Sequence, residues 1–163
     1  MLSRLRRPVP DVVKAVTLEP GERRRAWGVT TLGDPVVATD LGLHLPRSGR
    51  IDWHEVERAT WKRPVLGISK VAAVDGTGPR WQLELTEEVD LADVVRSSVT
   101  ASVGWTNHVR LQPSGGVRIV GRRRPGQDAL DWQLVFDVGT DPDDPQLRAQ
   151  AEALLADARR TIG

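Results

Sequence analysis

Two arginine triplets are the residues whose type and spacing come closest to a ligand site in this chain. They occupy positions 23–25 and 122–124, and each triplet lies in a segment whose pattern predicts a β-strand. Alternate residues of a strand face opposite sides, so each triplet places at most two guanidinium groups on one face. If the two strands are neighbours, phosphate groups can bind to a patch formed by Arg23, Arg25, Arg122 and Arg124. The competing interpretation is that these arginines are solvated and protect exposed strand edges from pairing with other chains.

The dipeptide His54-Glu55 is the best candidate for acid–base chemistry. A zinc metalloprotease helix needs a second histidine four residues after the first, and Arg58 occupies that position. Two tryptophans flank the dipeptide, which suggests a groove lined by Trp53, His54 and Trp61. Catalysis requires a converging set of groups, however, and the sequence supplies only neighbours. We therefore expect a protein with no catalytic residues, and we rank an enzyme that uses His54 with Glu55 as the last alternative.

Neither a metal site nor a cofactor site is indicated by the spacing of ligand residues. The chain has no cysteine, and its three histidines, His44, His54 and His108, are isolated from one another in the sequence. The acidic run at 137–144 lacks the alternating oxygens, central glycine and terminal glutamate of a calcium-binding loop. The glycine-containing segment at 76–79 lacks the lysine and the following helix of a phosphate-binding loop. We expect the protein to use no metal and no cofactor.

The charge and hydropathy of the chain limit its partners and its location. With 23 Lys and Arg against 22 Asp and Glu, the formal net charge is +1, which gives no general attraction to nucleic acid or anionic lipid. No apolar run approaches the roughly 20 residues that cross a bilayer. The N-terminus is basic but lacks the apolar core of a secretory signal. We therefore expect a cytoplasmic protein that forms one domain over residues 1–163.

The segment RIDWHEVERATW at 50–61 is the stretch around which the predicted strands are arranged. Its large apolar residues change from a spacing of two to a spacing of three, which is typical of a strand that ends, turns a corner and restarts. Turn residues recur every few positions on either side, which indicates an antiparallel meander and not βαβ units. A hairpin loop is expected at 75–79. The other predicted strands cover 23–31, 36–39, 43–45, 65–71, 81–85, 103–111, 117–124 and 130–138.

Helical spacing of apolar residues predicts three helices. Asp11 is placed to cap a short helical turn after a loose basic arm at 1–10, and a second helix is expected at 90–102. Asp144 and Pro145 predict the start of the last helix, because an acidic N-cap and a proline at the first position favour initiation. We expect this helix to cover a sheet face with a stripe formed by Leu147, Ala151, Leu154, Leu155, Ala158 and Ile162.

Three motifs in the first half of the chain carry a resemblance to known proteins. They are GER…AW, VVATDLGLHL and RIDWHEVERATW followed by an apolar strand. Over nearly the whole chain the pattern resembles a family of uncharacterised conserved actinobacterial proteins, which implies no activity. Over residues 21–71 it also resembles bacterial pleckstrin-homology-like and GRAM-like domains. That second resemblance implies a bent sheet closed by a helix and a habit of binding peptides or lipid head groups, although fold does not determine function.

Two departures from the pleckstrin-homology-like pattern affect what the resemblance implies. The turn at 32–35 is short and acidic, whereas phosphoinositide binding needs a basic loop between the first two strands. The helix expected at 90–102 is either the closing helix of such a domain, with everything after residue 103 an addition, or it lies inside one larger sheet.

The expected fold is α+β and β-rich. It consists of a bent antiparallel sheet or partly open barrel, pleckstrin-homology-like, with a long C-terminal amphipathic helix. The expected function is a non-catalytic binding or scaffold module for a protein or peptide partner. The alternative is binding of an anion, nucleic acid or lipid head group through the arginine-rich strands, with nucleic acid disfavoured by the balanced charge. The oligomeric state is open between monomer and homodimer, because an exposed strand edge allows either.

Overall fold

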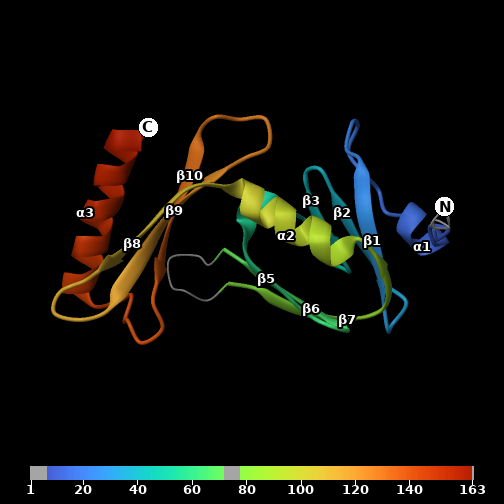
Figure 1. Cartoon of the computed structure of the whole chain (residues 1–163), viewed down its shortest axis with the longest axis horizontal. Coiled ribbons are helices and arrows are strands. Elements are labelled where there is room, and N and C mark those ends of the chain that lie inside the picture. The colour runs from blue at the N-terminus through green and yellow to red at the C-terminus, as the bar shows by residue number, and fades with distance from the viewer. Residues whose placement is uncertain (1–6, 72–77, 163) are drawn as a thin grey trace, which may run out of the picture.

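The larger of two β-sheets in the chain is a curled antiparallel sheet of seven strands (Figure 1). The computed structural model describes residues 7–71 and 78–162. The strand order is β4-β3-β2-β1-β7-β6-β5, so β1 lies in the middle and pairs with both β2 and β7. The strands are β1 (Arg24–Thr30), β2 (Pro35–Thr39), β3 (Gly42–Leu45), β4 (Gly49–Asp52), β5 (Val56–Lys62), β6 (Val65–Lys70) and β7 (Arg80–Val89).

Tight turns explain why the first four strands form a meander. At the β2–β3 turn, the backbone N–H groups of Leu41 and Gly42 donate to the hydroxyl of Thr39 at 3.1 and 3.2 Å. Gly42 has no room for a side chain, because a Cβ there would collide with the carbonyl oxygen of Ile51 on β4. A larger residue at position 42 would therefore disturb the pairing of β3 with β4.

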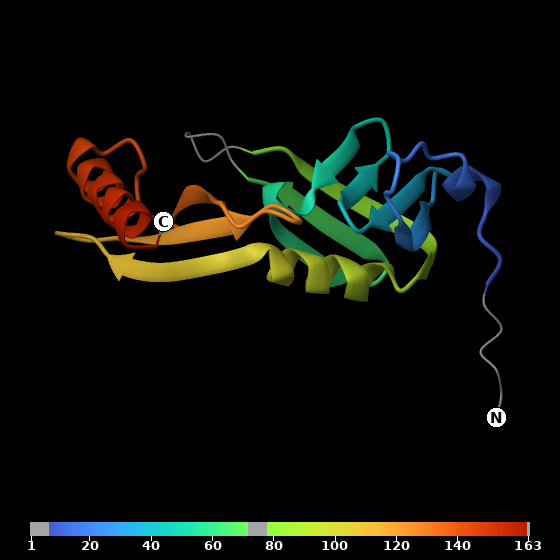
Figure 2. The ribbon, with the colours of Figure 1, turned by 90° about the horizontal axis from the view of Figure 1, so that it is seen from above.

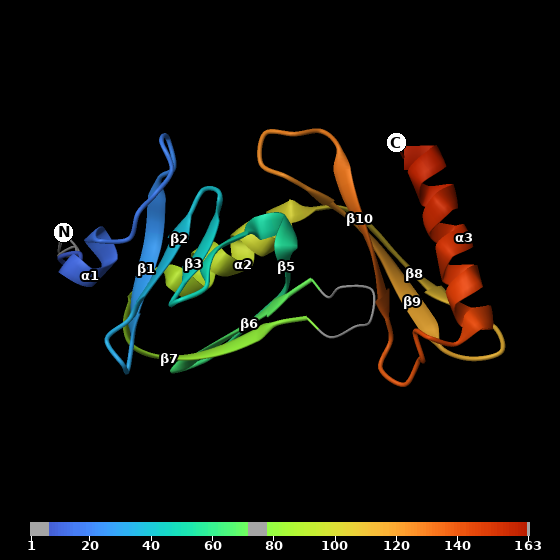
Figure 3. The same ribbon diagram turned by 180° about the vertical axis from the view of Figure 1, so that it is seen from behind.

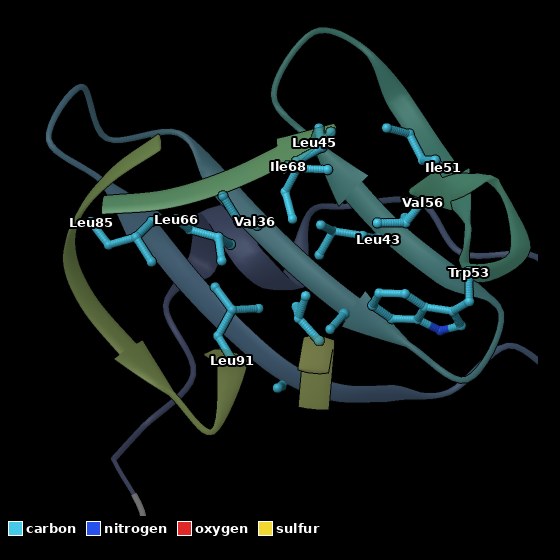
Figure 4. Packing of buried hydrophobic residues seen from close by; sticks show 13 residues of the cluster. Val36, Leu43, Leu45, Ile51, Trp53, Val56, Leu66, Ile68, Leu85 and Leu91 are labelled. Carbon is cyan, nitrogen blue, oxygen red and sulfur yellow. The ribbon is translucent and has the colours of Figure 1, made fainter. Parts of the chain in front are cut away.

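The helix α2 (Leu91–Ser102) packs against the inner face of the curled sheet. It follows β7 directly, because Asp90 takes a positive φ of 57° and the carboxylate of Glu88 accepts the N–H of Leu91 at 2.8 Å. Leu91 and Val95 are buried, and burial of each such side chain contributes roughly 1.5–3 kcal/mol. The core around them includes Val36, Leu43, Leu45, Ile51, Val56, Leu66, Ile68 and Leu85 (Figure 4). The expected α+β fold with a bent antiparallel sheet is confirmed, and α2 packs against that sheet.

Trp53 occupies the predicted corner of the sheet. A 3-10 turn, η1 (Trp53–Glu55), separates β4 from β5, and the indole is 3 % exposed within the core (Figure 4). Its Nε1 donates to the carbonyl oxygen of Thr39 at 2.9 Å. Asp52 and Glu55 form a capping box around the turn, which fixes the angle at which the chain leaves β4. The corner is therefore confirmed, with a 3-10 turn where the two strand segments meet.

The strands that follow α2 form a second sheet of their own. They are β8 (Val103–Arg110), β9 (Gly116–Arg123) and β10 (Leu130–Phe136), in the antiparallel order β10-β9-β8. Figure 2 shows α2 running straight into β8, which carries the chain away from the seven-stranded sheet. The strands after residue 103 are therefore an addition and not an extension of the larger sheet.

The C-terminal helix α3 (Pro145–Ile162) covers one face of this second sheet (Figure 2). Asp144 caps it as expected, because its carboxylate accepts the N–H groups of Gln146 and Leu147 at 2.9 and 3.2 Å. Leu147, Ala151 and Ala158 are buried, which confirms that the apolar stripe faces the sheet except at its end, where Ile162 is 44 % exposed. The core between them also contains Leu111, Val117, Leu134, Phe136 and Leu154.

Two details of the predicted elements are wrong. Pro10, not Asp11, is the N-cap residue of the short helix α1 (Asp11–Lys14), so the Asp11 carboxylate lies in the first turn and makes no cap hydrogen bond. Val138 lies in the turn after β10 and is fully exposed, because the strand ends at Phe136. Two expected segments fall mostly outside the described residues: the hairpin loop at 75–79 and the basic arm at 1–10.

Candidate functional site

A groove lined by arginines lies where the two sheets meet. It is a cavity of about 240 Å³ between α2, the beginning of β1 and the hairpin that joins β9 to β10. The loop of that hairpin reaches back toward the seven-stranded sheet (Figures 1 and 3). We call this cavity the arginine groove, and it is lined by Arg25, Asp40, Trp53, Ser98, Ala101, Ser102, Arg123, Arg124, Pro125 and Gly126.

A β-bulge in β1 places Arg25 in the groove. Arg24 pairs with Thr39 and Ala26 pairs with Ala38, so Arg25 is an extra residue with no partner on β2. A bulge interrupts the alternation of the strand and re-aims the side chain at that position. Arg25 is exposed, and it makes no ion pair with any residue in 7–71 or 78–162.

Two further arginines enter the groove from the end of β9. Arg123 is the last residue of the strand, and Arg124 begins the hairpin loop. The Nε of Arg124 donates to Asp131 Oδ2 at 2.8 Å, and this hydrogen bond raises the pKa of Arg124. Arg123 has no carboxylate partner in the described part of the chain. Three arginines therefore line the groove together with Asp40, and two of them, Arg25 and Arg123, form no ion pair among the described residues.

Ser98 adds a hydroxyl without a partner to the α2 side of the groove. Its Oγ is buried and makes no hydrogen bond to any described residue. A buried hydroxyl without a partner is unfavourable, and native proteins satisfy most such groups. Because this oxygen is shielded from solvent, a ligand in the groove contacts it only after the Ser98 side chain rotates toward the cavity.

Arg122 joins the two sheets and is not available to a ligand. It faces the opposite side of β9 from Arg123 and is 5 % exposed. Its Nη1 donates to Ser102 Oγ at 3.0 Å, and its Nη2 donates at 3.2 Å to the carbonyl oxygen of Glu57, the bulged residue of β5. Burial lowers the pKa of Arg122, and the negative charge of Glu57 opposes that effect. The role of Arg122 is to hold β9 against α2 and β5.

The predicted patch of four arginines does not form as a unit. Arg25 and Arg124 line the arginine groove, Arg122 is buried at the junction, and Arg23 lies outside the groove. Sequence reasoning missed Arg123 because alternation along the strand places it on the opposite face from Arg122 and Arg124. Arg124 donates to Asp131, the residue of β10 that pairs with Arg122, so it stays on the side of Arg122, and both Arg123 and Arg124 line the groove at the end of the strand. The available signal was the Pro-Gly turn that follows directly and marks the strand end.

His54 lines a different cavity, of about 390 Å³, on the other side of the hairpin loop. Its Nε2 lies 3.5 Å from Asp131 Oδ2, and its Nδ1 is buried without a hydrogen-bond partner among the described residues. Glu55 accepts the backbone N–H of Asp52 at 3.2 Å, so its carboxylate is engaged in capping η1. His54 and Glu55 line the same cavity, but each is engaged with another group of the chain, and the absence of catalytic residues stays a prediction.

The three residues of the predicted aromatic groove lie in three separate cavities. Trp53 lines the arginine groove, and His54 lines the cavity beside the hairpin loop. Trp61 is half-buried near the end of β5 and lines a third cavity together with Arg63 and Glu87. The 3-10 turn and the length of β5 separate residues that are close in sequence.

A second polar cluster is satisfied within the chain. The side chain of Glu22 is 0 % exposed, and its Oε1 lies 2.6 Å from the hydroxyl of Thr39 and 2.8 Å from His44 Nε2. Its Oε2 accepts the backbone N–H of Glu19 at 2.9 Å and Nη1 of Arg50 at 3.2 Å. Burial by itself would raise the pKa of Glu22, but these contacts outweigh burial and lower the pKa to about 2. We call these five residues the Glu22 cluster, and their complete contacts indicate a structural role.

His44 and His108 each lie beside one carboxylate group. His44 contacts Glu22, whereas His108 Nε2 lies 2.7 Å from Asp137 Oδ2 on the second sheet. Within residues 7–71 and 78–162, no three histidine, aspartate or glutamate side chains gather in a way that would hold a metal ion. The histidines are thus distributed over both sheets, each beside its own carboxylate.

Known proteins give no indication of what this site binds, so its function is inferred from the geometry described above. None of the described helices combines the length and the apolar content needed to cross a membrane. The chain matches no family model, no curated protein and no solved structure.

Proposed function

We propose that this chain is a non-catalytic binding module that holds an anionic ligand in the arginine groove. The observation that supports the proposal is the convergence of Arg25, Arg123 and Arg124 from two distant segments of the chain. Two of these guanidinium groups have no carboxylate partner among the described residues. Neighbouring like charges repel one another, and an anion bound between them removes that unfavourable interaction.

The chemistry of the lining suits a carboxylate or a phosphate group. A guanidinium presents parallel N–H donors that match two oxygens of either group. The unpartnered hydroxyl of Ser98 supplies a further hydrogen bond on the α2 side. The cavity of about 240 Å³ is smaller than the roughly 300–1,000 Å³ of small-molecule pockets, which favours one anionic group of a longer ligand.

Salt-dependent binding to labelled anions tests this proposal directly. Three probes represent the classes of anion: an octaglutamate peptide, an eight-nucleotide oligothymidylate, and phosphatidylcholine vesicles that contain phosphatidylserine. At low salt we expect measurable binding of at least one probe, with an affinity that falls as salt rises. The double variant Arg25→Glu with Arg123→Glu should weaken that binding by about tenfold or more, because two attractive contacts become repulsive.

A matched control separates the groove from the general charge of the protein. Arg110 and Arg159 are exposed arginines outside the groove, so Arg110→Glu with Arg159→Glu makes the same change in net charge. If both double variants lose affinity equally, the binding is general electrostatics and the groove is not the site. If the unmodified protein binds none of the three probes at low salt, the proposal fails as a whole.

A protein or peptide partner that adds a strand is the second candidate function. The edges of the larger sheet are β4 and β5, and those of the smaller sheet are β8 and β10. None of these four strands contains proline. Edge strands present backbone groups with which an extended peptide can pair. Such a partner should bind equally well to the arginine variants, and it should slow amide hydrogen exchange along one edge strand.

A further inference from the structure

A pair of tryptophans lies on the sheet face that leads into the arginine groove. Trp105 on β8 and Trp132 on β10 both pair with Gly121 of the central strand β9. Their rings meet edge to face, with centroids 5.6 Å apart and planes at 62°. Both side chains are half-buried, and neither indole N–H has a hydrogen-bond partner in the described segments. The pair therefore offers partly accessible ring surface and two indole N–H groups available to a ligand.

Arg123 connects this tryptophan pair to the groove. It follows Gly121 by two residues on β9, so the two positions share a face and lie about 6.6 Å apart. A Cβ built on Gly104, the residue before Trp105, would lie 3.8 Å from Nη2 of Arg123. The same Cβ would lie 2.6 Å from Leu130, so this leucine crosses the face beside the guanidinium. The guanidinium of Arg123 and the side chain of Leu130 therefore both lie beside Gly104, which precedes Trp105 in the chain.

We infer that the ligand of the arginine groove is a single-stranded nucleic acid. A phosphate lies among the groove arginines, and the adjoining base stacks on the tryptophan pair. This inference rests on the proposed function and names the ligand class of the same site. A base and its own phosphate are joined through one sugar ring. That short link fits a base subsite at Gly121 and a phosphate subsite at Arg123, which are two residues apart on the same face of β9. Every base has an aromatic face, so binding should show little sequence preference.

Other anions would use only part of this surface. An acidic peptide can pair with the arginines but leaves the tryptophan pair uncovered. A duplex keeps its bases paired and stacked inside, where protein side chains cannot stack on them. The net charge of +1 provides little long-range attraction to phosphates, so affinity must come from local contacts such as stacking. A single strand offers phosphates and exposed aromatic faces together.

Comparison of a normal strand with an abasic strand tests the inference. Fluorescence anisotropy at low salt measures the affinity for an eight-nucleotide oligothymidylate and for a deoxyribose-phosphate strand of equal length. Both probes carry the same phosphates, and only the first has bases. We expect about tenfold or more tighter binding of the oligothymidylate, the size of effect produced by stacking of a base on an aromatic side chain. The substitution Trp132→Leu should abolish this difference and leave the affinity for the abasic strand unchanged.

The control substitution is Trp81→Leu, which changes a half-buried tryptophan on the seven-stranded sheet and should alter neither affinity. Equal affinities of the unmodified protein for the two strands overturn the stacking inference and leave the groove as an anion site. Tighter binding of octaglutamate than of oligothymidylate overturns it as well. Failure to bind any anion overturns the proposed function and this inference together. If Trp132→Leu does not fold, the comparison of the two strands on the unmodified protein decides the question.

Discussion

Two polar regions of this protein, the Glu22 cluster and the arginine groove, differ in whether their hydrogen bonds are complete. Each oxygen of the Glu22 carboxylate has two contacts within the chain, and the side chain is fully buried. In the groove, Arg25, Arg123 and the hydroxyl of Ser98 have no such partners among the described residues. Charges that are satisfied internally stabilise a fold, whereas unsatisfied ones are available to a ligand. The two regions should therefore respond to mutation in opposite ways.

Removal of the Glu22 carboxylate should have the largest effect on stability. Glu22→Ala leaves His44 without its acceptor and removes one acceptor from both Arg50 and Thr39, and breaking a buried ion pair in this way costs about 3–5 kcal/mol. The free energy of unfolding in urea measures the change. Glu152→Ala removes an exposed carboxylate from an i,i+4 pair on α3 and should cost less than about 0.5 kcal/mol. Similar losses from both variants would show that the Glu22 cluster is no more structural than the surface.

Acidification should weaken the same cluster. The pKa of Glu22 is lowered from 4.5 to about 2 in the folded protein, so the folded state binds this proton more weakly than the unfolded state. The resulting stabilisation is fully present above pH 4.5 and is lost as the pH falls from 4.5 toward 2. For this one group, the loss is on the order of 3 kcal/mol. Urea unfolding at a series of acidic pH values measures it, and Glu22→Gln should flatten the curve. An equally steep curve in that variant would assign the acid sensitivity to other carboxylates.

The hydroxyl of Thr39 should also be needed for stability. It contacts Glu22 and accepts the two N–H groups of the β2–β3 turn, so Thr39→Val leaves several buried groups unpaired. We expect a loss of about 2 kcal/mol in the free energy of unfolding. Thr106→Val, at an exposed position on β8, is the matched control and should change stability by less than about 0.5 kcal/mol. The affinity of the Thr39 variant for oligothymidylate should stay unchanged, and a parallel loss of affinity would contradict the separation of the two regions.

Local sequence patterns were sufficient to predict most elements of this fold. Period-two apolar residues and frequent turn residues predicted the meander, and Asp144 before Pro145 predicted the start of α3. These signals depend on a few neighbouring residues, which is why they survive in the folded protein. The presence of two sheets depends on which strands pair across long stretches of chain, so the sequence left that choice open.

The arrangement of the site was harder to predict, because it depends on β-bulges. Extra residues at Arg25 on β1, Glu57 on β5 and Gly104 on β8 shift the alternation of their strands. A bulge is set by the register with a partner strand, and the residues around it carry no local pattern that announces it. The burial of Glu22 had no local signal either, since a buried glutamate and an exposed one look the same in a sequence.

Ser98→Ala should produce the smallest change in stability, and in the opposite direction from Thr39→Val. The Oγ of Ser98 is buried without a partner, and alanine is the better helix former in α2, so the variant should be more stable by about 0.5–1 kcal/mol. Its affinity for oligothymidylate should fall, by about threefold to tenfold, because the ligand loses one hydrogen bond. Urea unfolding and fluorescence anisotropy on the same preparation measure both quantities. A less stable Ser98→Ala protein would mean that the hydroxyl already has a partner in the folded chain. The arginine groove would then be a satisfied region like the Glu22 cluster, and the contrast between the two would disappear.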